Sequence, residues 1–429
     1  MFKTGLMIPQ VFITDGHWRK TLAAVRSLGQ KGLRVTVGES TRLAVSLFSR
    51  YCHRAVVYPS PLQQPDDFLD WLHRTLSRGS YRLFLAMEDE TQEWVSRHHA
   101  EFSRLTYLPF LPYQQIEPVR RKDLVIKLAQ KLGIPTPRTW FIDDLSQLEP
   151  IKNQLPYPLV IKPRIGSGAL GVSYINDPQK LASEYWRIHQ TYPFPMIQEQ
   201  IPRQGPGLGA SFLFDEKSRV KASFMHQRLR EYPLSGGAST LRQSIKNDEI
   251  RAMGETLLKA LNWFGVAMVE FKLDPRDNTP KLMEINSRFW GSLALAIASG
   301  VDFPHLVYRL ACGEEFRPVE HYKIGQQCRW LLPGDLLHFV YNPDRWKLKP
   351  SFFRFFDPDL CYDILSWDDP LPTLGTVLTP LTFLYDPDMQ LRMKKRKHIN
   401  RSHLKNRKMN SIKLKIPRSL FHFLFGSHF

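Results

Sequence analysis

A strand, a glycine loop and a second strand follow one another between residues 158 and 175. The apolar run 159–161 ends at Lys162, and the extended pattern resumes at Val172. Between them, the loop 166–171 has the spacing G-x-G-x-x-G and presents bare N–H groups that suit a phosphate. A dinucleotide fingerprint needs a helix directly after the loop, and a P-loop needs Gly-Lys-Ser/Thr, so neither motif is indicated. The stretch is either a phosphate cradle or an ordinary β-hairpin with a glycine turn.

Length and composition indicate a globular protein of two to four domains, because 429 residues with 43% hydrophobic content can bury large cores. The longest small-apolar stretch, 293–301, is far shorter than the ~20 residues that cross a bilayer as a helix. Residues 1–10 lack the apolar core and cleavage site of a secretory signal, so we expect a cytoplasmic protein. The four cysteines have no paired spacing, which argues against a zinc site and a disulfide framework.

Basic charge is concentrated at the end of the chain. Residues 391–429 hold twelve of the 59 Lys and Arg and no acid, so the other 390 residues account for only +6 of the net charge of +18. The segment also contains the apolar stretch 419–425. This combination suits peripheral contact with an anionic membrane. A disordered solubilising tail is the alternative, and nucleic acid would use the same charges without the aromatic residues, so we expect no specific nucleic-acid partner.

The first 114 residues contain four strand patterns and a helix pattern. Strand patterns at 11–14, 33–37, 55–58 and 82–86, with helix 18–29 between the first two, predict a Rossmann-like parallel sheet in an α/β fold. Ligands lie at the carboxyl ends of such strands, which favours a functional role for the acids 88–90. An ordinary helix N-terminus explains these acids equally well.

A helix is predicted over 117–132, after a proline-rich break. Leu124, Leu128 and Leu132 fall on one face, and a glycine followed by prolines ends the helix at 133–137. Lys122 lies one turn inside this helix.

A hairpin at 266–288 brings acids together. If the four-residue turn 275–278 pairs Asp274 with Thr279, Glu270 comes level with Glu284, and Asn286 shares its face. Oxygen ligands of this kind suit Mg²⁺, which shares its sites with nucleotide phosphates. A solvated cross-strand face is the alternative for the two glutamates.

Two other segments remain open. The predicted loop 227–237 carries Arg228 and Arg230, which form either an anion clamp for a substrate or a surface loop with unpaired arginines. Residues 319–390 read as an irregular C-terminal appendage.

Taken together, the chain resembles the ATP-grasp superfamily, and more narrowly its carbamoyl-phosphate-synthase-like and carboxylate–amine ligase branch. The resemblance covers about residues 115–315. It rests on Arg121-Lys122-Asp123 with 133–137, Val160-Ile-Lys162-Pro with its glycine loop, Ile197-Gln-Glu-Gln-Ile-Pro202, Val269-Glu270-Phe271, and Met283-Glu284-Ile-Asn286-Ser-Arg288. The family more often has Asp-Lys where this chain has Arg121-Lys122. The acid that often binds ribose after Pro202 is missing.

The resemblance implies a Rossmann-like domain at 1–114, a two-lobed α+β ATP-grasp domain at 115–318, the appendage at 319–390 and the tail at 391–429. The implied cofactors are ATP and Mg²⁺, with Mn²⁺ as a substitute. The nucleotide-binding residues would be Lys122, Lys162, Gly166, Ser167, Gly168, Gly171, Gln198, Glu199 and Ile201. The metal ligands would be Glu270, Glu284 and Asn286, and the catalytic residues would be Arg288 and Lys162.

The implied activity is ATP-dependent ligation of a small-molecule carboxylate to an amine through an acyl phosphate. A bicarbonate-activating carboxylase-type enzyme and a non-catalytic nucleotide-binding protein are the alternatives.

Overall fold

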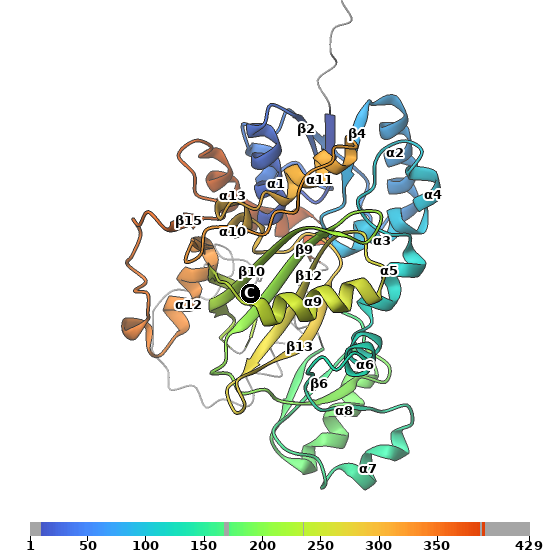
Figure 1. Cartoon of the computed structure of the whole chain (residues 1–429), viewed down its shortest axis with the longest axis vertical. Coiled ribbons are helices and arrows are strands. Elements are labelled where there is room, and N and C mark those ends of the chain that lie inside the picture. The colour runs from blue at the N-terminus through green and yellow to red at the C-terminus, as the bar shows by residue number, and fades with distance from the viewer. Residues whose placement is uncertain (1–9, 167–170, 235, 387, 391–429) are drawn as a thin grey trace, which may run out of the picture.

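The computed structural model describes residues 10–166, 171–234, 236–386 and 388–390, and the statements below concern these residues. Within them the chain builds an N-terminal parallel sheet, a small antiparallel sheet and a large seven-stranded sheet (Figure 1). The predicted α/β fold, with a parallel sheet followed by a two-lobed part, is confirmed. The tail 391–429, Ser167 and Gly168 lie outside the described residues.

The N-terminal sheet pairs its strands in parallel in the order β3-β2-β1-β4. Its elements are β1 (Gln10–Ile13), α1 (Arg19–Gln30), β2 (Arg34–Glu39), β3 (Arg54–Val57), α2 (Pro65–Arg78), β4 (Tyr81–Leu85), α3 (Asp89–Arg97) and α4 (His99–Phe102). Helix α3 begins directly after β4 and carries Asp89 and Glu90 in its first turn. The acids 88–90 therefore do form a helix N-terminus, at the carboxyl end of a strand.

The predicted helix 117–132 is two helices, α5 (Tyr113–Arg120) and α6 (Lys122–Lys131). Arg121 between them is extended, with φ −86° and ψ 103°, and the Lys122 amide donates to the Arg164 carbonyl outside the helix at 2.7 Å. Lys122 is thus the first residue of α6, not a residue one turn inside a longer helix.

The predicted apolar face of this helix is also wrong. Leu124 and Leu132 are exposed, whereas α6 buries Val125, Ile126 and Ala129. Helix α6 starts anew after the break at Arg121, and its rotation turns Val125, Ile126 and Ala129 toward the protein.

The small sheet forms a lobe of its own at the bottom of Figure 1. Its order is β5-β8-β6-β7, with the glycine loop joining β6 to β7 as a hairpin. Its elements are β5 (Thr139–Phe141), α7 (Leu148–Ile151), β6 (Leu159–Lys162), β7 (Ser173–Ile175), α8 (Leu181–His189) and β8 (Met196–Glu199). A compact apolar core that includes Leu159, Ile161 and Tyr185 lies beneath the sheet.

The large sheet has the order β13-β12-β9-β10-β11-β14-β15. Its strands are β9 (Gly207–Phe214), β10 (Val220–Tyr232), β11 (Ala238–Ser244), β12 (Gly265–Asp274), β13 (Thr279–Asn286), β14 (Gln327–Arg329) and β15 (Leu360–Tyr362). Strand β10 continues through 227–232, so the loop predicted over 227–237 is wrong in its first half. Pairing with β9 and β11 on both sides keeps these residues extended.

The two faces of the large sheet differ. One face packs on α9 (Asp248–Ala260) and shares a continuous core with the N-terminal unit, through residues such as Phe212, Leu257 and Phe84. The other face is apolar at one end, where Phe224 and Met268 pack with α10 (Leu293–Ala298) and α11 (Phe303–Ala311). Farther along the same face the side chains become charged, and this is where the predicted site lies.

Residues 319–390 are attached to this architecture rather than separate from it. They supply β14 and β15 to the large sheet and two helices, α12 (Leu336–Tyr341) and α13 (Leu371–Tyr385). Much of the remaining segment is irregular, as expected. No helix within the described ranges combines the length and apolar character needed to cross a bilayer.

The corrected face of α6 can be tested by stability. We expect Ile126→Ala to lower the free energy of unfolding by about 2–5 kcal/mol, because it leaves a cavity in the core. Leu124→Ala, on the exposed face of the same helix, should cost less than about 1 kcal/mol. Urea denaturation of both variants measures the difference, and a larger loss for Leu124→Ala would contradict the burial described above.

Candidate active site

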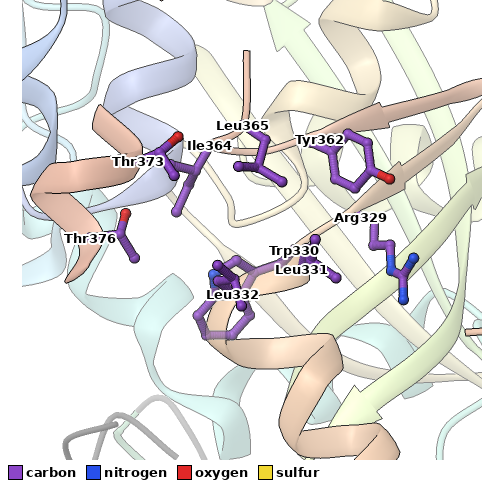
Figure 2. Close-up of a pocket in the computed structure, with 9 residues that line it drawn as sticks. All are labelled: Arg329, Trp330, Leu331, Leu332, Tyr362, Ile364, Leu365, Thr373 and Thr376. Carbon is purple, nitrogen blue, oxygen red and sulfur yellow. The ribbon is translucent and has the colours of Figure 1, made fainter. Parts of the chain in front are cut away.

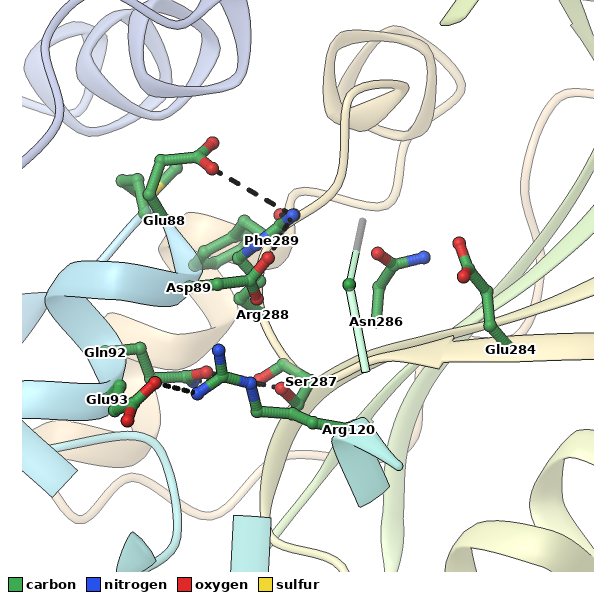
Figure 3. A network of polar contacts seen from close by, with 12 residues as sticks. Glu88, Asp89, Gln92, Glu93, Arg120, Glu284, Asn286, Ser287, Arg288 and Phe289 are labelled. Carbon is green, nitrogen blue, oxygen red and sulfur yellow. Dashed lines mark hydrogen bonds and ion pairs between the residues drawn. The ribbon is translucent and has the colours of Figure 1, made fainter. Parts of the chain in front are cut away.

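Two glutamate side chains lie opposite each other on the charged part of the large sheet. Glu270 of β12 pairs with Glu284 of β13, one residue beyond the position that the turn alone would give. The pairing shifts by one residue between Glu270 and Phe271, where a bulge at Met283 adds an extra residue to β13. The bulge lets Leu282 stay in the core while Glu284 points to the opposite face. Figure 3 shows Glu284 and Asn286 side by side on β13.

Each carboxylate is held by a cation. Arg228 Nη2 contacts Glu270 Oε2 at 2.6 Å, and Asn286 Nδ2 donates to Glu270 Oε1 at 3.0 Å. Lys122 Nζ contacts Glu284 Oε2 at 3.0 Å. Burial and the neighbouring Glu284 raise the pKa of Glu270, although Arg228 opposes them. Burial also acts to raise the pKa of Glu284, but the Lys122 ammonium outweighs it and holds that pKa below the usual value.

Two lysines meet beside Glu284. Lys122 also donates to the Gly166 carbonyl, which ties the start of α6 to the root of the glycine loop. Burial and the Lys122 charge lower the pKa of Lys162 to about 8. The Lys162 ammonium makes no hydrogen bond or ion pair with another residue in the described ranges. Two ammonium groups close to one carboxylate leave positive charge that an anion can take up.

Two glycines in β9 allow Arg228 to reach Glu270 across an intervening strand. Gly209 lies between Glu270 and His226 in the pairing, and a Cβ there would come 2.3 Å from the His226 ring. A Cβ on Gly207 would come 3.0 Å from Arg228 Cδ. The side chains of β10 therefore lie over β9 toward β12. Glycines at alternate positions inside a strand signal such a close approach, and Gly207 and Gly209 are not among the predicted site residues.

Arg230 does not join this group. Arg228 pairs with Arg242 but Arg230 pairs with Leu241, so a bulge between them turns Arg230 to the opposite face. There it is buried, contacts Asp335 at 2.7 Å and donates to the Pro350 carbonyl. The prediction that Arg230 belongs to a substrate clamp is therefore wrong, and the alternative of unpaired arginines is wrong for both residues.

Arg288 is held by acids of the N-terminal unit (Figure 3). Its Nη2 lies 2.8 Å from Asp89 Oδ2 and 4.0 Å from Glu88 Oε2. Burial acts against the charge of Asp89, but Arg288 lowers the pKa of that carboxyl to about 2. The acids 88–90 thus begin α3, and two of them also contact Arg288, so a functional role for them stays a prediction that depends on the role of Arg288.

Further contacts fasten the same strand end to the N-terminal unit. Lys20 contacts Glu88 Oε1 at 2.6 Å and donates to the Phe289 carbonyl at 3.2 Å. Gln92 Nε2 donates to the Ser287 carbonyl at 2.8 Å. The segment that follows Asn286 is therefore positioned by residues nearly 200 and 270 positions earlier in the chain.

Strand β8, which carries the predicted nucleotide-binding residues Gln198 and Glu199, lies beside β6 in the small sheet. Gln198 Nε2 donates to Thr139 Oγ1 at 2.8 Å, and Glu199 accepts from the Arg138 amide at 2.9 Å. Glu199 also contacts Arg276 in the turn between β12 and β13 at 3.2 Å, which links the two sheets. Ile201, just beyond β8, is buried. Since both polar side chains are engaged, the strand offers backbone groups rather than side chains to a ligand.

The glycine loop is described only at its ends. Gly166 has φ +141° and Gly171 has φ +72°, conformations that favour glycine. A Cβ on Gly171 would also come 2.6 Å from Pro163 and 2.7 Å from Tyr192. The predicted residues Ser167 and Gly168 lie between them, outside the described ranges.

A small cavity lies apart from these residues (Figure 2). Its walls include Trp330, Tyr362, Leu365 and Thr373, and its volume is about 10 Å³. This volume holds about one water molecule, so the cavity is no candidate for a nucleotide.

Comparison with known proteins agrees with this geometry. A family model described as "ATP-grasp in the biosynthetic pathway with Ter operon" matches residues 221–331, which contain both glutamates and Asn286. Over these residues the chain is similar to an ATP-grasp family. The predicted resemblance to this superfamily and to its carboxylate–amine ligase branch is confirmed.

The chain is also similar to two curated ligases. It is 24% identical over 241 residues to the D-aspartate ligase of Enterococcus faecium, covering 52% of this chain and 57% of the ligase. It is 23% identical over 208 residues to the D-alanine–D-alanine ligase of Pelotomaculum thermopropionicum, covering 43% of this chain and 64% of the ligase. The chain thus spans less than two thirds of each relative.

A solved structure shows the same fold. Biotin carboxylase from Campylobacter jejuni, determined as a β,γ-ATP complex, superposes with a TM-score of 0.61 at 13% identity. The match covers 75% of this chain and 74% of the carboxylase.

The buried Lys162 predicts a pH dependence of stability. Its pKa is about 8 in the folded protein against 10.5 for an ordinary lysine, so the unfolded chain binds more protons between these values. The stability contribution of this residue therefore rises as the pH increases from 8 to 10.5. We expect Lys162→Met to raise the free energy of unfolding at pH 7 by about 1–3 kcal/mol, and this gain should shrink toward pH 10.5.

Urea denaturation at several pH values measures this gain, with Lys131→Met as the control because Lys131 is exposed at the end of α6. A Lys162→Met effect that is the same at pH 7 and pH 10 would contradict the lowered pKa of Lys162.

Proposed function

We propose that this ATP-grasp protein is an ATP- and Mg²⁺-dependent ligase that joins a carboxylate to an amine through an acyl phosphate. The observation that carries the proposal is the convergence of Lys122 and Lys162 on Glu284, next to Glu270 and Asn286. These residues come from both lobes, and together they supply charges for the phosphates and oxygens for a metal. The similarity to two amino-acid ligases supports the same chemistry.

The donor set fits Mg²⁺. Glu270 and Glu284 offer carboxylate oxygens and Asn286 an amide oxygen, which are the hard ligands that Mg²⁺ prefers. No group of three or more His, Cys, Asp and Glu side chains suited to a metal occurs elsewhere in the described part of the chain. A site of two carboxylates is incomplete without the phosphates of the nucleotide, as expected for a metal that arrives with ATP. Mg²⁺ bound there supplies positive charge between phosphates and substrate, and Mn²⁺ would suit the same oxygens.

The remaining roles follow from position. Lys122 and Lys162 hold the phosphates, and the loop 166–171, including Ser167 and Gly168, closes over them. The backbone of β8 and the segment to Ile201 edges the adenine, since the Gln198 and Glu199 side chains already have partners.

In the first step, a carboxylate oxygen of the substrate attacks the γ-phosphorus, and the bond to the ADP oxygen breaks. The Arg288 guanidinium steadies the transferred phosphoryl group. In the second step, the amine nitrogen attacks the acyl carbon, phosphate leaves, and the nitrogen loses a proton. The lysines and Arg288 offset the charge that develops between two anions, and closure of the loop excludes water that would hydrolyse the acyl phosphate.

Arg228 is our candidate for the substrate carboxylate. It is part-buried beside Glu270, and burial makes its fork of donors more selective for a carboxylate. Its contacts to Glu270 and Glu231 keep its pKa above the usual value, so it stays charged. Arg230 is excluded because it is buried against Asp335.

We also propose the division into residues 1–114, 115–318, 319–390 and 391–429, with the third segment completing the large sheet. Because the reaction consumes ATP, we place it in the cytoplasm.

The activity is tested by ADP release from ATP with pairs of amino acids and amines. We expect at least one pair to stimulate release, and Glu284→Ala or Lys162→Ala to reduce it by at least about 100-fold, because each removes a group next to the phosphates. Both variants should remain folded by circular dichroism. Lys131→Ala, at an exposed site on α6, is the control. Full turnover in either site variant would contradict the assignment, and ATP binding without release for any pair would favour a non-catalytic role.

The contact between Asp89 and Arg288 makes a separate prediction. Asp89→Asn removes the charge that positions Arg288, so we expect kcat for ADP release to fall by up to about 100-fold. The KM for ATP should change little, because Asp89 touches Arg288 and not the nucleotide. Asp67→Asn, at the exposed start of α2, is the matched control. A raised KM with unchanged kcat would show that Asp89 acts on substrate binding instead.

A further inference from the structure

Helix α13 distributes its apolar and polar residues between its inner and outer faces in the reverse of the usual way for a surface helix. Its fifteen residues include no charged side chain. Its small and hydroxyl-bearing residues face the protein: Gly375 lies over Phe48, where a Cβ would come 2.7 Å from the ring, and Thr379 and Thr382 are buried. Three large apolar residues face outward, because Leu371, Leu374 and Val377 are exposed by 55%, 53% and 59%. A surface helix normally shows the reverse pattern.

The inner face explains how the helix stays in place. Thr379 Oγ1 donates to the Gly375 carbonyl at 2.9 Å, and Thr382 Oγ1 donates to the Thr379 carbonyl at 2.6 Å. These hydroxyls are therefore satisfied within the helix and need no ligand. Gly375 permits close packing of α13 on residues 45–48 of the N-terminal unit. The helix is thus held by close approach on its inner face, while Leu371, Leu374 and Val377 on its outer face stay largely exposed.

The segment before α13 adds an exposed aromatic residue on a rigid support. Trp367 is 97% exposed and lies four positions before Leu371. The two residues that follow it are anchored to the N-terminal unit. Asp369 contacts Arg26 Nε at 2.9 Å and accepts from Ser49 Oγ at 2.6 Å, and Asp368 contacts Arg50 at 3.1 Å. The Asp368 charge is thereby offset.

Charge decides between the partners that could cover this surface. Residues 391–429 begin soon after α13 and contain twelve Lys and Arg without an acid, together with the apolar stretch 419–425. A second copy of the chain would bring the same positive charge, and the net charge of +18 opposes that association. Nucleic acid would match the charge but not an apolar helix face. An anionic lipid surface matches both, because basic residues and exposed Trp and Leu side chains favour it together.

We propose that the outward face of α13, formed by Leu371, Leu374 and Val377 with Trp367 beside it, docks on an anionic membrane surface with the help of the basic residues of 391–429. The contact is peripheral, because fifteen helical residues are shorter than the ~20 that cross a bilayer. The surface lies on the N-terminal unit and the C-terminal segment, so it does not involve the proposed nucleotide-binding residues. This inference is independent of the proposed ligase activity.

The test is flotation of the full-length protein with vesicles of phosphatidylcholine containing phosphatidylglycerol, compared with vesicles of phosphatidylcholine alone. We expect binding to the anionic vesicles that weakens as salt is added. The combined variant Leu371→Gln, Leu374→Gln and Val377→Gln should reduce the bound fraction by at least about tenfold, because it removes the apolar contact. Trp186→Gln, at a residue 49% exposed on α8, is the matched control and should bind like the unchanged protein.

The two parts of the proposal are separated by a charge variant, in which Lys394, Lys395, Arg396 and Lys397 are replaced by Gln in the full-length chain. It should lose most of the salt-sensitive binding. The α13 variant and Trp186→Gln should melt at the temperature of the unchanged protein, since each replaces only exposed residues, and the melting temperature of the charge variant is measured alongside them.

Four results would overturn the proposal. The first is absence of binding to anionic vesicles, and the second is equal binding of the combined α13 variant. The third is equal binding to neutral vesicles, which would remove the role of the basic residues. The fourth is self-association in sedimentation velocity that the α13 variant abolishes while vesicles bind nothing, which would assign the surface to a second copy of the chain.

Discussion

The opposition of Glu270 and Glu284 across β12 and β13 is the constraint on which the site depends. Like charges directly opposite each other destabilise a strand pair. Here each carboxylate has its own cation, Arg228 for one and Lys122 for the other, and the pKa values of the two acids shift in opposite directions. The surrounding structure brings these cations into range. The break before α6, the glycines of β9 and the bulge in β13 all serve this arrangement.

The N-terminal unit is a structural part of this site and not a separate module. It shares a core with the large sheet on both faces, and it holds the strand end after Asn286 through Lys20, Asp89 and Gln92. A charged residue such as Arg288 is fixed most firmly when its partners come from a packed element, because the partners then lose little freedom on forming the contact. The acids at the start of α3 meet this condition.

The C-terminal segment connects the inside of the protein with its surface. Its strands β14 and β15 extend the large sheet, and Asp335 balances the buried Arg230 and Arg329. The same segment then carries α13, whose Leu371, Leu374 and Val377 side chains are turned outward. Within sixty residues the segment thus combines a buried ionic cluster with an exposed apolar helix face, and the two have different roles. The first keeps the segment attached to the sheet, and the second directs part of it toward a partner.

The sequence by itself determined the elements whose signals are local. Alternating patterns indicated the strands of the N-terminal sheet, the four-residue turn set the pairing of Asp274 with Thr279, and the ordered motifs indicated the ATP-grasp resemblance. Local patterns of this kind depend on spacing along the chain, which a sequence displays directly. For this reason Glu270, Glu284, Asn286 and both lysines could be named in advance as a group.

Only the tertiary structure decided which partners those residues have. Arg230 turns away from the site because of a bulge that pairing with β11 imposes, and Arg288 pairs with Asp89 from nearly 200 residues earlier. The buried face of α6 followed from its rotation after Arg121, and not from the leucines that recur along it. In each case the deciding contact joins segments distant in the chain, so no local pattern records it. Lys162 shows both contributions. Its sequence motif predicted that it binds a phosphate, whereas only the tertiary structure, through burial and the neighbouring Lys122 charge, lowers its pKa to about 8.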